Sequence, residues 1–411
     1  MPVRRPSQLR EGASNSEYRL GNQHGCLGSR VATLPNGSDK IGPEVSVPAG
    51  GRAMQVTMTT DSGPVIRVGG KAISQISPAF VVAEAAGNHM RGMAYAVQLV
   101  DAAAEAGADA IKFQSYTAQK LTSKTAEGYG NIGTQSQYEY YRQFDRFGRS
   151  EYDELFDHAR EKGLVPFSTP FDPENAQMLN SVQVDLFKIA SCDLLYTDLL
   201  REVACFNKPV VISSGGASLD EIRRALDTLG TAGASEIVLL ACTMAYPTRT
   251  EDAHYRRILT LRREFPECLV GVSDHVEPDP HMITGAVCVA LGAVMLEKHF
   301  ALARDMGGGS AISMTPEDLR AYVANVRRAE ESLGSDEVKV YTAEEETRRS
   351  ARRSLVAQSD LVAGTLLSRE MLGVKRPGTG IGPEHIDDIV GRRLARDLAS
   401  EAQLEWKDLE Q

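Results

Sequence analysis

The sequence predicts an α/β protein built as a (β/α)₈ TIM barrel, followed by a small C-terminal domain. From Ala79 onward, eight short apolar runs alternate with segments of helical period over about 250 residues, the usual size of this fold. The runs are apolar along nearly their whole length, as are the strands of a parallel sheet that is buried on both faces. A doubly wound sheet is the alternative, but no G-x-G-x-x-G follows the first run, so its dinucleotide-binding fingerprint is missing.

The eight predicted strands are AFVVAEA (79–85), DAIKFQS (109–115), LVPFSTP (164–170), LFKIAS (186–191), PVVISSG (209–215), EIVLLACT (236–243), LVGVSDH (269–275) and VMLEKHF (294–300). Amphipathic patterns over 94–107 and 218–230 predict two of the helices between them. In the second helix, Ser218 suits the N-cap and Gly230 suits the C-terminal stop.

The bulk composition excludes some classes of function. The net charge of −10 argues against a nucleic-acid binder, because nothing offsets the repulsion of phosphate. Six cysteines without C-x-x-C spacing predict buried free thiols in a reducing compartment. No apolar run is long enough to span a membrane and no secretory signal opens the chain, so we expect a cytoplasmic protein.

Residues 1–60 differ from the rest, since they are rich in Gly, Pro and Ser and lack periodicity. This composition predicts a disordered leader. The alternative is an over-long start assignment, with Met54 or Met58 as the true first residue.

Every predicted strand ends in polar or charged side chains. In chain order these are Glu84, Lys112 with Gln114, Ser168 with Thr169, Lys188 with Ser191, Ser213 with Ser214, Thr243, Ser273 to His275, and Glu297 with His299. A barrel gathers the C-terminal ends of its strands on one face, where the active sites of this fold lie. One shared polar site explains the set better than eight strands that each happen to reach the surface.

Two kinds of ligand suit these side chains. His275 and His299 end neighbouring strands and could share a divalent cation, Mn²⁺ or Mg²⁺ as well as Zn²⁺, although a lone histidine is more often a core residue. Lys112 and Lys188, with nearby hydroxyls, suit a phosphate or carboxylate. A cation beside an anion pocket favours attack of an anionic carbon nucleophile on a polarised carbonyl. A Schiff-base aldolase and a barrel that binds a sugar phosphate without turnover are the alternatives.

Several motifs, taken together and in order, resemble the sialic acid synthases, which are phosphoenolpyruvate-dependent synthases of N-acetylneuraminate and related nonulosonic acids. They are VVAEAAGNH, DAIKFQS, PFSTPFD, FKIAS, SDH, EKHF, RRSLVA and VKRPGTGI, and they extend from about residue 65 to 404. The resemblance implies a TIM-barrel synthase domain over 65–333, a linker over 334–350 and an antifreeze-like (SAF) domain over 351–408. It also implies a domain-swapped homodimer, in which each small domain covers the partner's barrel mouth.

The same resemblance assigns roles to residues at matching positions. It implies that His275 and His299 bind the metal and that Glu84, Asp193 and Gln114 are the catalytic residues. The implied phosphoenolpyruvate contacts are Lys112, Thr169, Lys188, Ser191, Ser213 and Ser273, and the implied sugar contacts are Asn131, Tyr246 and Arg376.

The implied reaction condenses phosphoenolpyruvate with an open-chain N-acetylmannosamine-like aldose and water, giving a nonulosonic acid and phosphate. The sequence departs from the family pattern near the sugar. Met244 replaces a more usual polar residue, Ala241 replaces a frequent His or Gln, and Gly309 or Ser310 stands where a sugar-binding Asp is usual. Loss of a hydrogen-bonding group changes which hydroxyl pattern a site tolerates. Legionaminate, pseudaminate or another 3-deoxy-ulosonate therefore remain alternative products.

Overall fold

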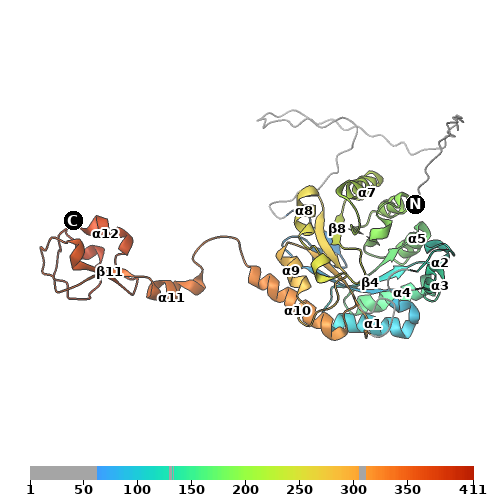
Figure 1. The fold of residues 1–411 in the computed structure, drawn as a ribbon, viewed down its shortest axis with the longest axis horizontal. Helices are drawn as coiled ribbons and strands as arrows, with labels where there is room; N and C mark the ends of the chain where they lie inside the picture. The colour runs from blue at the N-terminus through green and yellow to red at the C-terminus, as the bar shows by residue number, and fades with distance from the viewer. Residues whose placement is uncertain (1–62, 129–131, 133, 305–311) are drawn as a thin grey trace, which may run out of the picture. The chain divides into compact units, whose positions relative to one another are not determined.

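The computed structural model describes residues 63–128, 132, 134–304 and 312–411. Within these ranges the chain forms one eight-stranded parallel sheet surrounded by helices (Figure 1). The strands of this sheet are β3 (Phe80–Ala86), β4 (Ala110–Ser115), β5 (Val165–Pro170), β6 (Phe187–Ile189), β7 (Val210–Ser213), β8 (Ile237–Cys242), β9 (Leu269–Asp274) and β10 (Met295–His299). All eight strands predicted from the sequence are present.

The sheet closes almost completely into a barrel. Its strand order is β5-β4-β3-β10-β9-β8-β7-β6, and the two end strands, β5 and β6, also contact each other. Nearly every strand residue is buried, because one face of the sheet packs against the helices and the other fills the barrel interior. The prediction of a TIM barrel is therefore confirmed, and the doubly wound alternative is wrong.

At least one helix follows each strand, three of them after β4, and helices surround the barrel (Figure 1). The barrel helices are α1 (Met93–Glu105), α2 (Ala118–Leu121), α3 (Gln137–Tyr141), α4 (Arg149–Glu161), α5 (Pro173–Ser181), α6 (Thr197–Cys205), α7 (Leu219–Ala232), α8 (Arg257–Glu264), α9 (Thr284–Ala290) and α10 (Pro316–Leu333). Ser218 caps α7 as predicted, since its hydroxyl accepts a hydrogen bond from Glu221 N. The predicted stop at Gly230 is wrong. The helix continues to Ala232 and ends at Gly233, which adopts φ 115°, a conformation that favours glycine.

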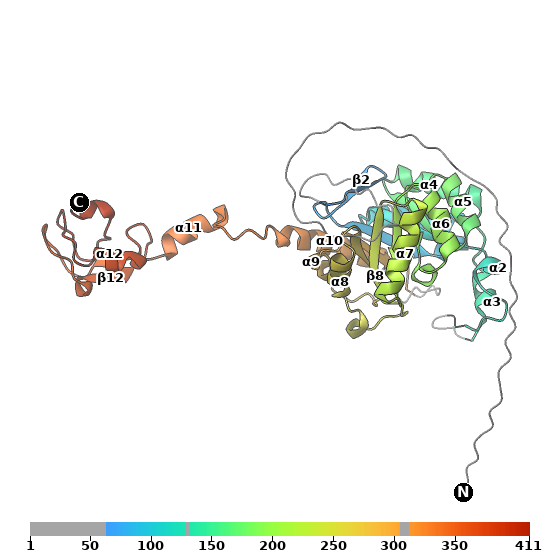
Figure 2. The ribbon, with the colours of Figure 1, turned by 90° about the horizontal axis from the view of Figure 1, so that it is seen from above.

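A hairpin that the sequence patterns did not predict lies at the N-terminal end of the barrel. It consists of β1 (Ile66–Val68) and β2 (Lys71–Ile73), and Figure 2 shows β2 beside the barrel strands. Its apolar side chains join a buried cluster with Phe80 and Val82, residues of the first barrel strand. The hairpin therefore fills the end of the barrel opposite the strand C-termini, which leaves only the C-terminal end open for a site.

The C-terminal part of the chain has a hydrophobic core of its own, formed by residues from Leu355 to Leu409. Its elements are β11 (Ser354–Ala357), which pairs antiparallel with β12 (Leu372–Lys375), and α12 (Ile386–Ile389). The predicted linker 334–350 contains most of a helix, α11 (Thr342–Ala351), none of whose residues is buried.

Two further predictions concern thiols and membranes. The cysteines in the described ranges are free, and Cys242, Cys268 and Cys288 are buried as expected, whereas Cys192 and Cys205 are exposed and contradict that expectation. Cys26 and the predicted leader 1–60 lie outside the described residues. In the part of the chain that the structure describes, no helix is long and apolar enough to cross a membrane.

Candidate active site

The C-terminal ends of the strands bring many of the predicted polar side chains into the barrel interior. Side chains alternate between the two faces of a strand, so every second residue of a barrel strand points inward. On β10 this rule makes Glu297 and His299 neighbours on the same face. Eight members of the set are assigned to this face, and each is at most 6% exposed: Glu84, Lys112, Thr169, Lys188, Ser213, Ser273, His275 and Glu297.

Two lysines and two glutamates form a buried four-charge cluster, defined here as Glu84, Lys112, Lys188 and Glu297. Lys112 Nζ lies 2.5 Å from Glu84 Oε2 and 3.8 Å from Glu297 Oε2, while Lys188 Nζ lies 3.7 Å from Glu297 Oε1. Since two positive and two negative groups compensate each other, the cluster offsets part of the desolvation cost that a single buried charge would carry. Lys112 also donates to Thr169 Oγ1 at 3.0 Å, and Ser273 donates to Glu297 Oε1 at 2.8 Å.

The two glutamates have opposite protonation tendencies. Burial raises the pKa of Glu84 to about 7, although Lys112 opposes the shift. Burial also acts to raise the pKa of Glu297, but Lys112 and Lys188 outweigh it, and the pKa of Glu297 is lowered from its usual value. Burial lowers the pKa of Lys188. Glu84 is therefore suited to take up and release a proton near neutral pH, whereas Glu297 stays ionised between the two lysines.

Hydroxyl groups complete the side of the site around Lys188. Ser213 Oγ is buried and has no hydrogen-bond partner in the described part of the chain. Ser191 lies in the short helical turn Ser191–Asp193, directly after β6, and its Oγ accepts a hydrogen bond from Gly215 N at 3.0 Å. A side chain at Gly215 would bring a Cβ within 2.8 Å of Ser191 Oγ, so glycine allows this close approach. Ser213 ends β7, the strand paired with the Lys188 strand β6, and a buried, unpaired hydroxyl there is chemically suited to an anionic ligand.

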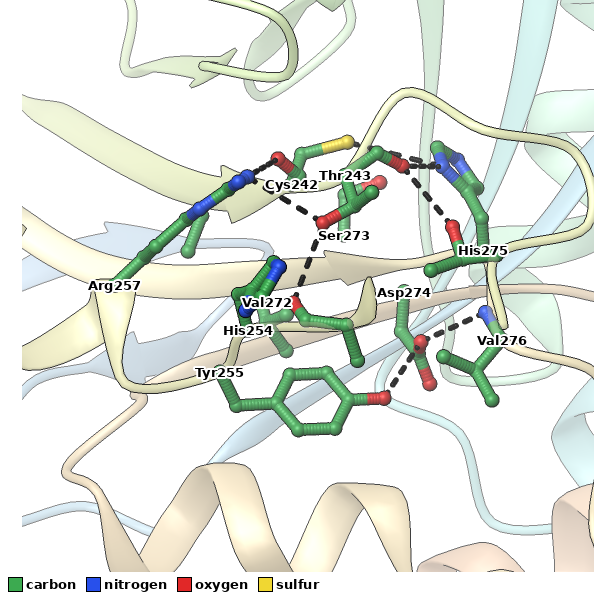
Figure 3. A pocket seen from close by; sticks show the side chains of 13 residues that line it. Cys242, Thr243, His254, Tyr255, Arg257, Val272, Ser273, Asp274, His275 and Val276 are labelled. Carbon is green, nitrogen blue, oxygen red and sulfur yellow. Dashed lines mark hydrogen bonds between the residues drawn. The ribbon is translucent and has the colours of Figure 1, made fainter. Parts of the chain in front are cut away.

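The two histidines lie next to each other at the ends of β9 and β10. Their ring centroids are 5.3 Å apart, and the Tyr246 ring lies 4.2 Å from that of His275. His275 Nδ1 donates to the carbonyl of Thr243 at 2.9 Å, as Figure 3 shows, which leaves Nε2 as the nitrogen with the free lone pair. Burial lowers the pKa of His275 and places that of His299 well below its usual value, so both imidazoles are neutral at pH 7.

The neutral pair has the donor chemistry of a metal site with few protein ligands. Neutral imidazole is the form that binds Mn²⁺, Zn²⁺ and similar cations. Among the described residues, no group of three or more His, Cys, Asp or Glu side chains is arranged to hold a metal ion. Two protein ligands would leave several coordination positions to substrate or solvent, which is typical of a catalytic rather than a structural site.

The predicted catalytic residues other than Glu84 lie at the edge of the same site. Gln114 donates to Glu84 Oε1 at 3.4 Å, a long hydrogen bond that links β4 to β3. Asp193 is partly buried after β6, and burial raises the pKa of its carboxyl to about 6. The structure therefore brings together Glu84, Gln114, both histidines, Tyr246 and the six residues expected to contact phosphoenolpyruvate, with Asp193 adjacent to Ser191.

For four residues named on the sugar side, the structure gives no position at the site. Asn131, Gly309 and Ser310 are outside the described residues, and Arg376 belongs to the C-terminal domain, after β12. Two residues near the site were given no role of their own in the sequence analysis. Glu297 joins the lysines, and Cys242 Sγ lies 3.8 Å from His275 Nδ1. Glu297 was already in the set of polar strand ends, and the period-two alternation of β10 places it on the same face as His299.

Comparison with known proteins gives consistent matches over most of the chain. The NeuB family model matches residues 99–338, and the SAF domain model matches residues 352–410. An uncharacterized protein of Methanocaldococcus jannaschii is 36% identical over 345 residues, covering 84% of this chain and 98% of its own. The N,N'-diacetyllegionaminic acid synthase of Legionella pneumophila is 36% identical over 341 residues, covering 80% of this chain and 94% of its own. Among solved structures, the N-acetylneuraminic acid synthetase of Leptospira borgpetersenii is 30% identical with a TM-score of 0.63, covering 70% of this chain and 95% of its own.

Proposed function

The chain belongs to the NeuB family of sialic acid-type synthases, and we propose that it condenses phosphoenolpyruvate with an open-chain N-acetylmannosamine-like aldose and water. The products are a nonulosonic acid and phosphate. The chain is an enzyme, a transferase of the phosphoenolpyruvate-dependent condensing type. The proposal includes a domain-swapped homodimer, because the family resemblance implies one. It also includes a cytoplasmic location, because phosphoenolpyruvate is a cytoplasmic metabolite.

The observation that carries the proposal is the arrangement of cations and hydroxyls around Lys112 and Lys188. Phosphoenolpyruvate bears a phosphate and a carboxylate, and both groups seek ammonium and hydroxyl donors. Lys112, Lys188 and the unpaired hydroxyl of Ser213 supply such donors at the closed end of the site. When the phosphate leaves, the same lysines balance its charge. Thr169, Ser191 and Ser273 add further hydroxyls around them.

A divalent metal, Mn²⁺ or Mg²⁺, is part of the proposal, held by His275 and His299. The neutral imidazoles, the fixed Nδ1 of His275 and the small number of protein ligands fit a cation with open positions. When bound, such a cation supplies Lewis-acid polarisation of the sugar aldehyde. The ring of Tyr246 beside His275 then limits the space in which the sugar can lie.

The bond changes balance as follows. Carbon 3 of phosphoenolpyruvate forms a bond to the aldehyde carbon while the carbonyl π bond breaks and the aldehyde oxygen takes up a proton to become a hydroxyl, and a water adds to carbon 2. Phosphate leaves by cleavage of the bond between carbon 2 and the bridging oxygen, so that the water oxygen becomes the new keto oxygen. Glu84 or Asp193 accepts the proton of the attacking water, since both carboxyls have a pKa raised toward neutrality.

The proposal also names the acceptor sugar. N-acetylmannosamine is favoured by the family resemblance and by the neuraminic acid synthetase among the similar structures. The legionaminic acid synthase among the relatives supports a diacetamido hexose as the alternative acceptor. Met244, which is 48% exposed, departs from the family pattern on the sugar side, and this departure agrees with a different acceptor. A pseudaminate or other 3-deoxy-ulosonate precursor is a further alternative.

The test measures phosphate release from phosphoenolpyruvate with a panel of aldoses, each with Mn²⁺ and with EDTA. The panel contains N-acetylmannosamine, mannose and the diacetamido hexoses of the legionaminate and pseudaminate routes. We expect metal-dependent release with one acetamido sugar, and a bridging ¹⁸O label should be recovered in the phosphate. The His299→Ala variant should stay folded and lose the metal-dependent release.

One observation favours a second candidate, a Schiff-base aldolase. Burial lowers the pKa of Lys188, which favours the neutral amine that such chemistry needs. An aldolase of this kind would resist EDTA and would be trapped by borohydride together with a carbonyl substrate. That result would replace the condensation proposal, while binding of sugar phosphates without any turnover would favour a barrel that has only a binding role.

A further inference from the structure

Asp274 and Lys298 are a buried ion pair on the outer side of the barrel wall, directly before the two histidines in sequence. They are paired residues of β9 and β10, and their side chains are 2% and 1% exposed. Because strand side chains alternate, they point away from the interior that contains His275 and His299. Their partners come from the outer layer of the barrel: Tyr255 precedes α8 and Thr284 is the first residue of α9.

Asp274 accepts four hydrogen bonds, two at each oxygen. Oδ1 accepts from Tyr255 OH at 2.9 Å and from Val276 N at 3.0 Å, and Figure 3 shows both. Oδ2 accepts from Thr284 Oγ1 at 2.8 Å and from Lys298 Nζ at 2.8 Å. A buried carboxylate with every acceptor position filled is held rigidly, because any movement would break a hydrogen bond where water cannot replace it.

Lys298 extends this restraint to the chain after His275. Its Nζ donates to the carbonyl of Val276 at 2.5 Å as well as to Asp274. The amide N–H of Val276 is bound by Asp274 and its carbonyl by Lys298, so both polar groups of the residue after His275 are fixed. The carbonyl of His275 also accepts from Thr248 N at 3.0 Å. Hydrogen bonds therefore connect Asp274 and Val276, the residues on either side of His275, with Lys298, the residue that precedes His299.

We propose that the Asp274–Lys298 pair is a positioning device that sets the distance and orientation between the imidazoles of His275 and His299. The inference rests on the proposed function, in which these histidines bind the metal. A buried ion pair adds little net stability compared with an apolar pair of the same volume, so stability alone is a weak reason for its presence. Residues behind metal ligands commonly change metal affinity by 10- to 100-fold when they are altered.

The test uses the double variant Asp274→Asn with Lys298→Met, which keeps the side-chain volumes and leaves no buried charge unpaired. We expect Co²⁺ affinity, measured from the visible absorption of the bound ion, to fall 10- to 100-fold, with a changed absorption spectrum. The matched control is Asp109→Asn with Arg327→Met, which removes an ion pair between α10 and the residue directly before β4. Asp109, which also pairs with Lys71, stands at the N-terminal end of its strand, whereas the histidines stand at the C-terminal ends of theirs. The Co²⁺ affinity and spectrum of this control should equal those of the wild type.

A second measurement requires no metal. With ¹⁵N-labelled histidine, the ring signals of His275 and His299, assigned from His275→Gln and His299→Gln, should shift in the double variant and stay unchanged in the control. If the double variant does not fold, Co²⁺ affinity is measured in Thr284→Val instead. This variant removes one of the four hydrogen bonds to Asp274 without leaving a buried charge unpaired. A several-fold loss of Co²⁺ affinity then supports the inference.

Three results distinguish failure of this inference from failure of the proposed function. Wild-type Co²⁺ affinity and histidine signals in the folded double variant, or in Thr284→Val as the fallback, overturn the positioning role. If the wild type binds no Co²⁺, the proposed metal site is wrong, and the metal-free histidine signals alone decide whether the pair positions the rings. A fall in affinity that is equal in the Asp109–Arg327 control would mean a general loss of structure and would also overturn the inference.

Discussion

Glu84 is the residue whose protonation state should govern the pH dependence of the reaction. Burial raises the pKa of Glu84 to about 7, and the ionised form is the one that accepts a proton from water. We therefore expect kcat/KM for phosphoenolpyruvate to be high above pH 7 and to fall as the pH is lowered through about 7. Glu84→Gln should remove this inflection and lower kcat by about 10²- to 10⁴-fold, the usual contribution of a general base.

Asp193→Asn is the matched control for that pH profile. The pKa of Asp193 is raised to about 6, so a base at this position would give an inflection about one pH unit lower. If the inflection lies near pH 6 and disappears in Asp193→Asn while it persists in Glu84→Gln, the base is Asp193 rather than Glu84. Steady-state rates across pH 5 to 9 at saturating Mn²⁺ separate the two residues.

Single residues were predicted well from the sequence where strand position alone defines them. Lys112, Lys188 and His299 end apolar runs, and a barrel brings such ends together whatever the detailed packing. Glu297 was expected among the polar strand ends, but its role was not predicted, because a carboxylate two residues before a histidine has no special pattern until its contacts with both lysines are known. The hydrogen bonds of Asp274 likewise depend on three other elements that a linear sequence does not connect.

At the scale of elements, the turn between β3 and α1 contains a buried histidine that makes the barrel sensitive to acid. His89 lies among Phe113 and Tyr152, with Nδ1 donating to the carbonyl of Ala86 at 3.0 Å. Burial lowers its pKa from 6.5 to about 3. The neutral ring therefore stabilises the fold above pH 6.5, and this stability is lost as the pH falls from 6.5 toward 3. At pH 5 the loss is about 2 kcal/mol, from 1.36 kcal/mol per pKa unit.

Urea unfolding followed by far-UV circular dichroism at pH 7 and pH 5 measures this effect. His89→Gln should be less stable than the wild type at pH 7, since it loses ring packing, but its change between the two pH values should be smaller by about 2 kcal/mol. His281→Gln, which replaces an exposed histidine, should lose as much stability as the wild type. An equal pH dependence in His89→Gln and the wild type would contradict the assignment.

The elements that the sequence predicted correctly have a strong local signal. Barrel strands are buried on both faces, and so their apolar runs are continuous and easy to recognise. The end of α7 was misplaced because two glycines lie close together, and only Gly233 adopts the left-handed conformation that ends the helix. Helix α11 was assigned to a linker since it buries no side chain and therefore has no apolar stripe.

At the scale of the whole molecule, the chain has separate hydrophobic cores in the barrel and in the C-terminal domain. Separate cores allow a small domain to act on a barrel other than its own. Arg376, expected at the sugar site, belongs to the C-terminal domain, whereas His299 belongs to the barrel. The proposed domain-swapped dimer therefore predicts that one active site combines His299 of one subunit with Arg376 of the other.

Mixing two inactive variants tests this arrangement directly. His299→Ala lacks a barrel residue and Arg376→Ala lacks a C-terminal residue, so each alone should have little activity at low sugar concentration. When the two chains are produced together in equal amounts, about half of the dimers contain one of each, and in a swapped dimer one of their two sites has both residues intact. We expect about a quarter of the wild-type activity to return. No recovery, with mixed dimers verified by differently tagged chains, would mean that each site uses the His299 and Arg376 of the same chain, because the mixed dimer would then contain no complete site.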